Sequence, residues 1–234
     1  MGCRHFPHLH PPPVTGLHLT VPAACFRKGL AREFFETEPL PPPSTCYGFL
    51  LALTGEEDRD RHVGARVAPA ILGIPRVSTV LRTLWRHKEK QTGPYQPATN
   101  RRPDYQQLLT NLDLVIWLDS GDEEKPGPTL EDRVRMALDP ARRGGISRFG
   151  GLSLGESTHL VNDISLLPAS GGLHAPPAGE WRIFLEDPDR GSRSLPVWVD
   201  HVGSLKTRHA SGHLEAHDPA GAPPAGRMPQ ISSR

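Results

Sequence analysis

The segment at residues 112–118, LDLVIWL, contains one polar side chain, Asp113, among seven residues. A short apolar run rich in branched and aromatic residues is typical of a strand that is buried on both faces of a sheet. This segment therefore predicts the best-buried strand of the protein, and the chain around it has to supply the rest of a sheet.

Further strands are predicted where apolar and polar residues alternate, or where short apolar runs lie between turns. The first should kink or bulge at Pro22, and Pro69 favours an edge position for the second, because proline cannot donate to a sheet ladder. The predicted strands are residues 17–26, 65–72, 76 onward, 112–118, 181–185 and 195–199.

Helices are predicted in three places. The run LPPPST at residues 40–45 supplies Ser44 or Thr45 as the N-cap of a core helix over residues 47–53, which ends at Gly55. Gly48, early in that helix, suggests close approach to another backbone. Thr129 and Asp132 form a capping arrangement for an amphipathic helix to Leu138, and residues 104–109 are expected to form a short third helix.

Chain length and element order together suggest the fold class. A chain of 234 residues can bury one good core, while 26 Pro, 23 Gly and an apolar content of 36% indicate irregular ends. The order strand, helix, strand, strand, strand, helix predicts an α+β, ferredoxin-like domain. We expect a flexible leader (1–13), the domain (14–165) with an inserted thumb at about 86–105, a packed C-terminal extension (166–206) and a disordered tail (207–234).

Cysteine and histidine usage argues against a disulfide framework and a metal site. The three cysteines are odd in number and far apart, which fits a reducing cytoplasm. Neither the histidines at 5, 8 and 10 nor those at 209, 213 and 217 come with a fixed geometry or further ligands. No apolar run has the length of a membrane span. We therefore expect a soluble cytoplasmic protein without a cofactor.

The most basic part of the chain lies between Arg76 and Arg102, with seven Lys or Arg residues against one acid, Glu89. Such an excess predicts a polyanionic partner. The first half alternates like a strand with an apolar face and an outward cationic face, and the second half reads as a projecting loop. Trp85, Tyr95 and Tyr105 are possible stacking surfaces for bases. The alternative is a solvated strand face that binds nothing.

Residues 151–155, GLSLG, match the G-x-S-x-G pattern of hydrolases, and His159 or His174 could serve as a partner. The pattern needs an apolar strand before the serine and a helix after it. Residues 142–150 are basic and glycine-rich instead, which argues against a hydrolase.

Four segments resemble the RAMP superfamily of CRISPR proteins, and within it the fifth CRISPR-associated family, whose member holds the 5′ end of the guide RNA in Cascade. They span residues 17 to about 165 in the order of the family. The segments are residues 17–28 (first strand and basic loop), 40–56 (LPPPSTCYGFLLALTGE), 101–109 (RRPDYQQLL) before the buried strand, and 148–157 (RFGGLSLGES).

The resemblance implies an RRM-related fold with a basic thumb, which residues 76–102 would form. It also implies binding of the 5′ handle of the guide RNA (crRNA), contacts with a multi-copy backbone subunit and with the large subunit, and only indirect contact with target DNA. Lys and Arg would neutralise handle phosphates while backbone N–H groups of residues 150–155 approach oxygens. The expected RNA-binding residues are Arg27, Lys28, Arg82, Arg86, Lys88, Lys90, Arg101, Arg102 and Arg148.

Two alternatives remain open. Some branches of the family cut precursor RNA without metal through a Tyr, a Lys and a His, for which Tyr47, Lys88 and His87 are the candidates here. No spacing forces these three together, so we expect a non-catalytic binding protein rather than an enzyme. The second alternative is an RRM-like RNA binder outside any CRISPR complex.

Overall fold

The computed structural model describes residues 14–29, 34–85, 101–148, 150–167, 176–200 and 205–233, without the side chains of Leu84, Trp85, Arg101 and Arg102. These residues form one mixed α+β structure built on a nine-stranded sheet. The strands are β1 (Thr15–Ala24), β2 (Phe34–Phe35), β3 (Arg66–Leu72), β4 (Arg76–Trp85), β5 (Arg101–Asp119), β6 (Asp163–Leu166), β7 (Trp181–Glu186), β8 (Arg193–Trp198) and β9 (Arg208–His217). The helices are α1 (Pro43–Thr54) and α3 (Leu130–Leu138), with short 3₁₀ turns η1 (Arg143–Gly145) and η2 (Ala225–Arg227).

Strand β5 organises the sheet. Its second half pairs antiparallel with β1 on one side and β3 on the other, and the main strand order is β6-β1-β5-β3-β7-β9-β8. Its first half pairs with β4 and, over two residues, with β2. Asn111, with φ of 54°, lies just beyond the stretch that pairs with β4. The predicted buried strand at 112–118 is confirmed as the inner part of β5.

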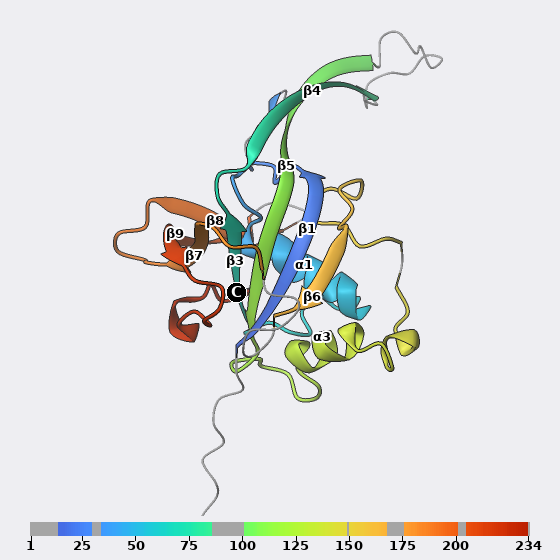
Figure 1. Ribbon diagram of the computed structural model, residues 1–234, viewed down its shortest axis with the longest axis vertical. Coiled ribbons are helices and arrows are strands. Elements are labelled where there is room, and N and C mark those ends of the chain that lie inside the picture. Colours follow the sequence, from blue (N-terminus) through green and yellow to red (C-terminus); the bar gives the residue numbers. More distant parts are fainter. Residues whose placement is uncertain are drawn as a thin grey trace, which may run out of the picture.

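The two faces of the sheet carry different cores. Helices α1 and α3 contact each other and cover one face, where Leu17 and Leu19 of β1 and Leu130 and Val134 of α3 are fully buried. Figure 1 shows α1 behind β1 and β5. The opposite face carries a smaller cluster around Trp117, Trp181 and Met228. The predicted amphipathic helix with its capping box at Thr129 and Asp132 is confirmed as α3.

Helix α1 starts earlier than predicted. It begins at Pro43 after Pro42, and no side-chain hydrogen bond caps it, so the expected N-cap at Ser44 or Thr45 is wrong. Proline fits the first turn because that turn needs no N–H partner within the helix. The predicted end at Gly55 is confirmed, with φ of 67°.

The inference that Pro69 marks an edge strand is also wrong. Strand β3 lies between β5 and β7, not at an edge, and β7 pairs with it only from Ala70 onward, which leaves Pro69 outside that ladder. Strand β1 has no bulge at Pro22, because its register to β5 is the same on both sides, although the ladder skips the pair of Pro22 and Asn111. Pro22 lies beyond the residues that β6 pairs, so its missing N–H is not needed on that side.

Residues 104–109 form part of strand β5 and not a helix. They pair with β4 from Arg82↔Asp104 to Val77↔Leu109. Cross-strand pairing here overrides the helix preference of the local sequence QQLL, because each residue gains a ladder partner that its neighbours in the chain cannot supply.

The expected disordered tail at 207–234 is wrong for the residues that the structure describes. Strand β9 lies between β7 and β8 in the sheet. Met228 and Ile231 are fully buried, and the Ile231 N–H donates to the Ala65 carbonyl. A polar, glycine-containing sequence can form an inner strand when its neighbours supply the apolar surface. The leader at 1–13 lies outside the described residues, and the other domain limits stay predictions.

Within the described ranges, no helix is long and apolar enough to cross a membrane.

Candidate nucleic-acid interface

The hairpin of β4 and β5 projects beyond the body of the protein (Figure 1). Its strands pair at ten positions, from Arg76↔Thr110 to Trp85↔Arg101, so its root lies before the expected thumb limit at residue 86. The predicted inward apolar face of β4 is wrong at its described positions. Val77 and Leu81 are 56% and 62% exposed, because the hairpin leaves the core instead of covering it. The alternation of side chains along β4 is real, but neither face is core.

Two of the predicted cations meet beside the outer half of this hairpin, where Arg82 pairs with Asp104. The guanidinium carbons of Arg27 and Arg82 lie 4.4 and 4.7 Å from the centre of the Phe35 ring. Such cation–π contacts contribute about 0.5–1 kcal/mol each at partly exposed sites. Phe35 is buried because β2 pairs with β5 at Gln106, and Arg82 reaches it from β4. We call Arg27, Phe35 and Arg82 the arginine–phenylalanine cluster.

Besides its contact with Phe35, the Arg82 guanidinium forms an ion pair with Glu156. Arg82 Nη1 donates to Glu156 Oε2 at 3.1 Å, and Gln106 Nε2 donates to Glu156 Oε1 at 3.0 Å. The side chains of Arg82 and Glu156 are 29% and 32% exposed, so solvent and salt reach the pair. The carboxylate fixes the guanidinium in place and offsets its charge.

The glycine-rich loop that carries Glu156 is fastened to the end of β1 through His159. His159 Nδ1 accepts the N–H of Cys25 at 3.2 Å and that of Glu156 at 3.3 Å. Burial lowers the pKa of His159, which favours the neutral ring that this arrangement needs. Gly155 has φ of 95°, and a Cβ there would lie 2.8 Å from the Cys25 carbonyl oxygen. The loop can approach β1 this closely only with glycine at 155.

The structure does not bring the remaining predicted RNA-binding residues together with Arg27 and Arg82. Lys28 forms an exposed ion pair with Glu36 at 3.9 Å. Arg148 donates from Nε to the Leu53 carbonyl at 2.9 Å, near the C-terminal end of α1, and is not among the residues that contact Phe35. Arg101 and Arg102 lie in β5 by their backbone, while Arg86, Lys88 and Lys90 lie outside the described residues, as do the possible stacking residue Tyr95 and the candidate His87.

Sequence reasoning missed Phe35, Gln106, Glu156 and the role of His159. Phe35 belongs to a two-residue strand, and the residues that meet around Arg82 come from four separate segments. The one local sign of this site was the pair of adjacent phenylalanines at 34 and 35, followed by charged residues. That pattern did not indicate that Arg27 and Arg82 contact Phe35.

Tyr47, the candidate for RNA cleavage, lies inside the protein. It is 3% exposed, and its hydroxyl donates to the Arg59 carbonyl at 2.7 Å. Burial raises the pKa of the Tyr47 hydroxyl above its ordinary value. At the G-x-S-x-G motif, Ser153 pairs through its backbone with Leu160, and the Nδ1 atom of His159 is taken up by backbone N–H groups.

The chain matches no protein-family model. It is 51% identical over 215 residues to the CRISPR-associated protein Cas5 of Myxococcus xanthus (strain DK1622), a match that covers 92% of this chain and 95% of the relative. The chain belongs to the Cas5 family. A chain of a solved CRISPR RNA-guided surveillance complex shares the fold of this Cas5-family chain, with a TM-score of 0.56, 13% identity, and coverage of 86% of this chain and 89% of that one.

Proposed function

We propose that this Cas5-family chain is a non-catalytic subunit of a type I CRISPR Cascade complex and binds the 5′ handle of the guide RNA. The observation that carries the proposal is the arginine–phenylalanine cluster on a projecting hairpin whose sequence is strongly basic. Arg27 and Arg82 come from separate segments and meet on one aromatic ring. Guanidinium groups that are held in place in this way suit the phosphates and splayed bases of single-stranded RNA.

The sheet topology supports a ferredoxin-like core for this subunit. In chain order the elements β1, α1, β3, β5, α3 and β6 give the spatial strand order β6-β1-β5-β3, with antiparallel neighbours throughout. A β-α-β-β-α-β unit with this arrangement is the ferredoxin-like pattern. The β4 hairpin is then an extension of its β3-to-β5 connection, which places the basic stretch at one end of the core.

The proposed partners are the guide RNA handle, the multi-copy backbone subunit and the large subunit, with target DNA reached through the guide. Family membership and the fold shared with a chain of an RNA-guided surveillance complex support this assignment. In such a complex base pairing reads the target, and the protein mainly fixes the geometry of the guide. The cytoplasmic location follows from the proposal.

The alternative is a metal-independent endoribonuclease. A general base has to reach the proton that it removes, and its pKa should lie near the working pH. Tyr47 is buried, donates its hydroxyl proton to a backbone carbonyl and has a raised pKa. These three properties favour a packing role for Tyr47 and so support the binding role of the chain.

The test measures binding of the purified chain to the repeat RNA of its own CRISPR array, in chelator and at several salt concentrations. Replacing Arg27, Arg86, Lys88, Arg101 or Arg102 by Ala should weaken binding and reduce the slope of log K against log salt by ~0.7 for each lost phosphate contact. Melting temperatures should stay close to wild type. Unchanged slopes in all five variants would contradict the proposal.

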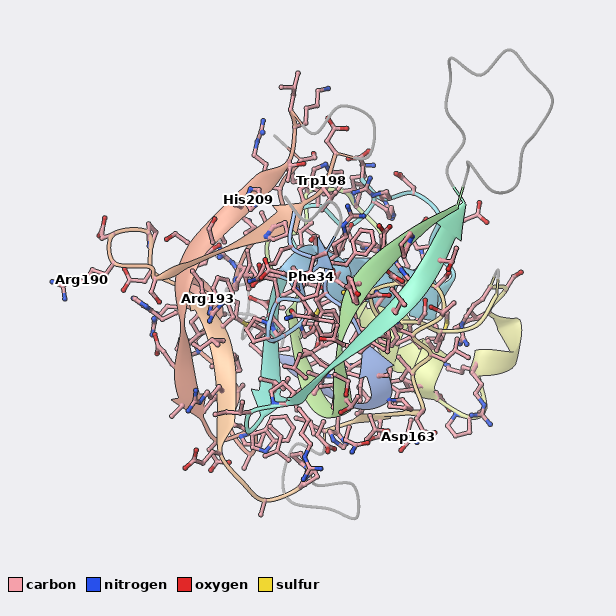
Figure 2. The ribbon with its side chains drawn as sticks, turned by 90° about the horizontal axis from the view of Figure 1, so that it is seen from above. Phe34, Asp163, Arg190, Arg193, Trp198 and His209 are labelled. Atoms are coloured by element: carbon pink, nitrogen blue, oxygen red, sulfur yellow. The ribbon has the colours of Figure 1, made fainter. Side chains whose placement is uncertain are left out.

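A matched control is Arg190→Ala. Arg190 lies on the loop between β7 and β8, away from the hairpin (Figure 2), and should leave both affinity and slope unchanged. The same incubations test the alternative, since cleavage of the repeat RNA in chelator that Tyr47→Phe abolishes would establish the endoribonuclease.

A further inference from the structure

Strand β4 has an open edge. All ten of its residues pair with β5 on one side, and no strand in the described part of the chain pairs with the other side. In an antiparallel pair, alternate residues direct their N–H and C=O groups away from the partner strand. The outer edge of β4 therefore presents a row of backbone donors and acceptors to solvent.

This edge has few of the features that usually prevent pairing, and its only charged residues are Arg76 and Arg82. Strand β4 contains neither proline nor lysine, and its register to β5 is constant, without a bulge. The strands at the two ends of the main sheet differ from it, because β6 has four residues and β8 has six with Pro196 among them. Native proteins commonly protect long edges with charges, proline, bulges or covering elements. Because Arg82 is already held by Glu156, Arg76 is the main charge that protects this ten-residue edge, which indicates a place where another strand adds.

The side chains along this edge favour a protein partner. Leu81, Tyr105 and Phe34 lie opposite one another on β4, β5 and β2, and they are 62%, 54% and 41% exposed. Val77 extends this apolar row along β4. On this face the described side chains of β4 are Val77, Thr79, Leu81 and Thr83, none of which is charged. RNA would need cations here, whereas an apolar polypeptide would not.

We propose that the outer edge of β4 binds an extended segment of another protein of the complex, which adds to the hairpin as a strand. The backbone ladder supplies the binding, and the side chains select the segment. Residues on the Val77 and Leu81 face of the added strand should be apolar. Residues on the other face, beside Arg76, should include an acid. The proposed RNA site lies on the opposite face of the same hairpin, where Arg82 reaches Phe35.

Amide hydrogen exchange tests the backbone contact directly. It is measured on the chain alone, on the chain with its repeat RNA, and on the particle formed by coexpression with the proteins encoded beside it. In the particle, the outward N–H groups of β4 should exchange more slowly by at least about tenfold, since paired amides open rarely. Repeat RNA alone should leave them fast.

Three outcomes would overturn the inference. The first is a particle in which the outward β4 amides stay fast, and the second is equal protection by RNA alone. The third is a chain that assembles with no other protein. None of these outcomes is the same as loss of RNA binding, so the inference and the proposed RNA-binding function can fail separately.

A double variant tests the side chains. Val77→Asn with Leu81→Asn removes the apolar row without adding charge, and both positions are already exposed, so the melting temperature should hold. Incorporation of the chain into the particle should fall by about tenfold or more, while the RNA affinity of the free chain stays unchanged. The control is Leu205→Asn, at a 91% exposed apolar residue before β9. Normal incorporation of the double variant would overturn the inference, as would loss of RNA affinity alone.

Discussion

At the residue scale, Glu156 would decide how much of the charge of Arg82 the proposed RNA site offers to a phosphate. The carboxylate bonds Arg82 at 3.1 Å and lies where a phosphate would otherwise compete for the same guanidinium. Ion pairs with this degree of exposure are worth little in stability, about 0–1 kcal/mol, so RNA can displace Glu156. The pair therefore affects binding more than folding.

The first prediction is that Glu156→Gln tightens RNA binding. The amide retains hydrogen-bonding capacity but leaves the charge of Arg82 available, so affinity should rise a few-fold, and the salt slope should steepen by up to ~0.7. Titration of labelled repeat RNA at several salt concentrations measures both effects.

The control is Asp58→Asn, which removes the acid of another exposed ion pair, with Lys125 at 3.2 Å. It should leave the affinity unchanged. An affinity of Glu156→Gln equal to or below that of wild type would show that Glu156 supports the site instead of competing for it.

At the element scale, two glycines have opposite roles in α1, Gly48 inside the helix and Gly55 at its C-cap. Gly48 was expected to mark a close backbone approach, and this is wrong, since a Cβ there would meet nothing within 4 Å. Gly55 ends the helix with φ of 67°, and a Cβ at this position would collide with the Ser147 carbonyl oxygen. One glycine is conformationally required and the other is not.

The second prediction follows from this difference. Gly48→Ala should raise the free energy of unfolding by about 0.5–1 kcal/mol, the usual advantage of Ala over Gly within a helix. Gly55→Ala should lower it by more than about 1 kcal/mol, because it adds a left-handed side chain to a steric clash. Urea unfolding of both variants measures the sign of each change in the free energy of unfolding. Destabilisation by Gly48→Ala would mean that another molecule or segment needs the open space beside α1.

At the scale of the whole molecule, the C-terminal segment joins both cores. Strand β9 fills the sheet between β7 and β8, Ile231 belongs to the core beneath the helices, and Met228 belongs to the cluster on the opposite face. The Val67 N–H donates to the Pro229 carbonyl at 2.8 Å, which ties the segment to β3 as well. We therefore expect the sheet and both cores to depend on this segment.

The third prediction is that deletion of residues 207–234 abolishes cooperative unfolding, because β7 and β8 lose their shared neighbour and both cores lose a fully buried side chain. Ile231→Ala should cost about 2–4 kcal/mol, the usual range for a large-to-small change in a core. Thermal unfolding followed by circular dichroism measures both. Leu205→Ala, at an exposed position, should match wild type, and a truncated protein with a near-native melting temperature would refute the assignment.

The local sequence determined those features whose physical cause lies within a few residues. The apolar run at 112–118, the alternation of Leu17, Leu19 and Val21, the capping box at Thr129 and the helix end at Gly55 were all predictable for this reason. The segments that resemble the RAMP family added the family itself, which the 51% identical relative bears out. The amino-acid composition of residues 76–102 also showed that this stretch is strongly basic.

Only the tertiary structure decided the features that depend on distant partners. Residues 104–109 and 208–217 are strands because β4, β7 and β8 pair with them, although their own sequences indicate a helix and a disordered tail. The site around Phe35 likewise joins residues from β2, β4, β5 and two loops. Ladder hydrogen bonds and side-chain contacts of this kind join residues that are far apart in the sequence. They form only when the fold brings those segments together, so the local sequence does not predict them.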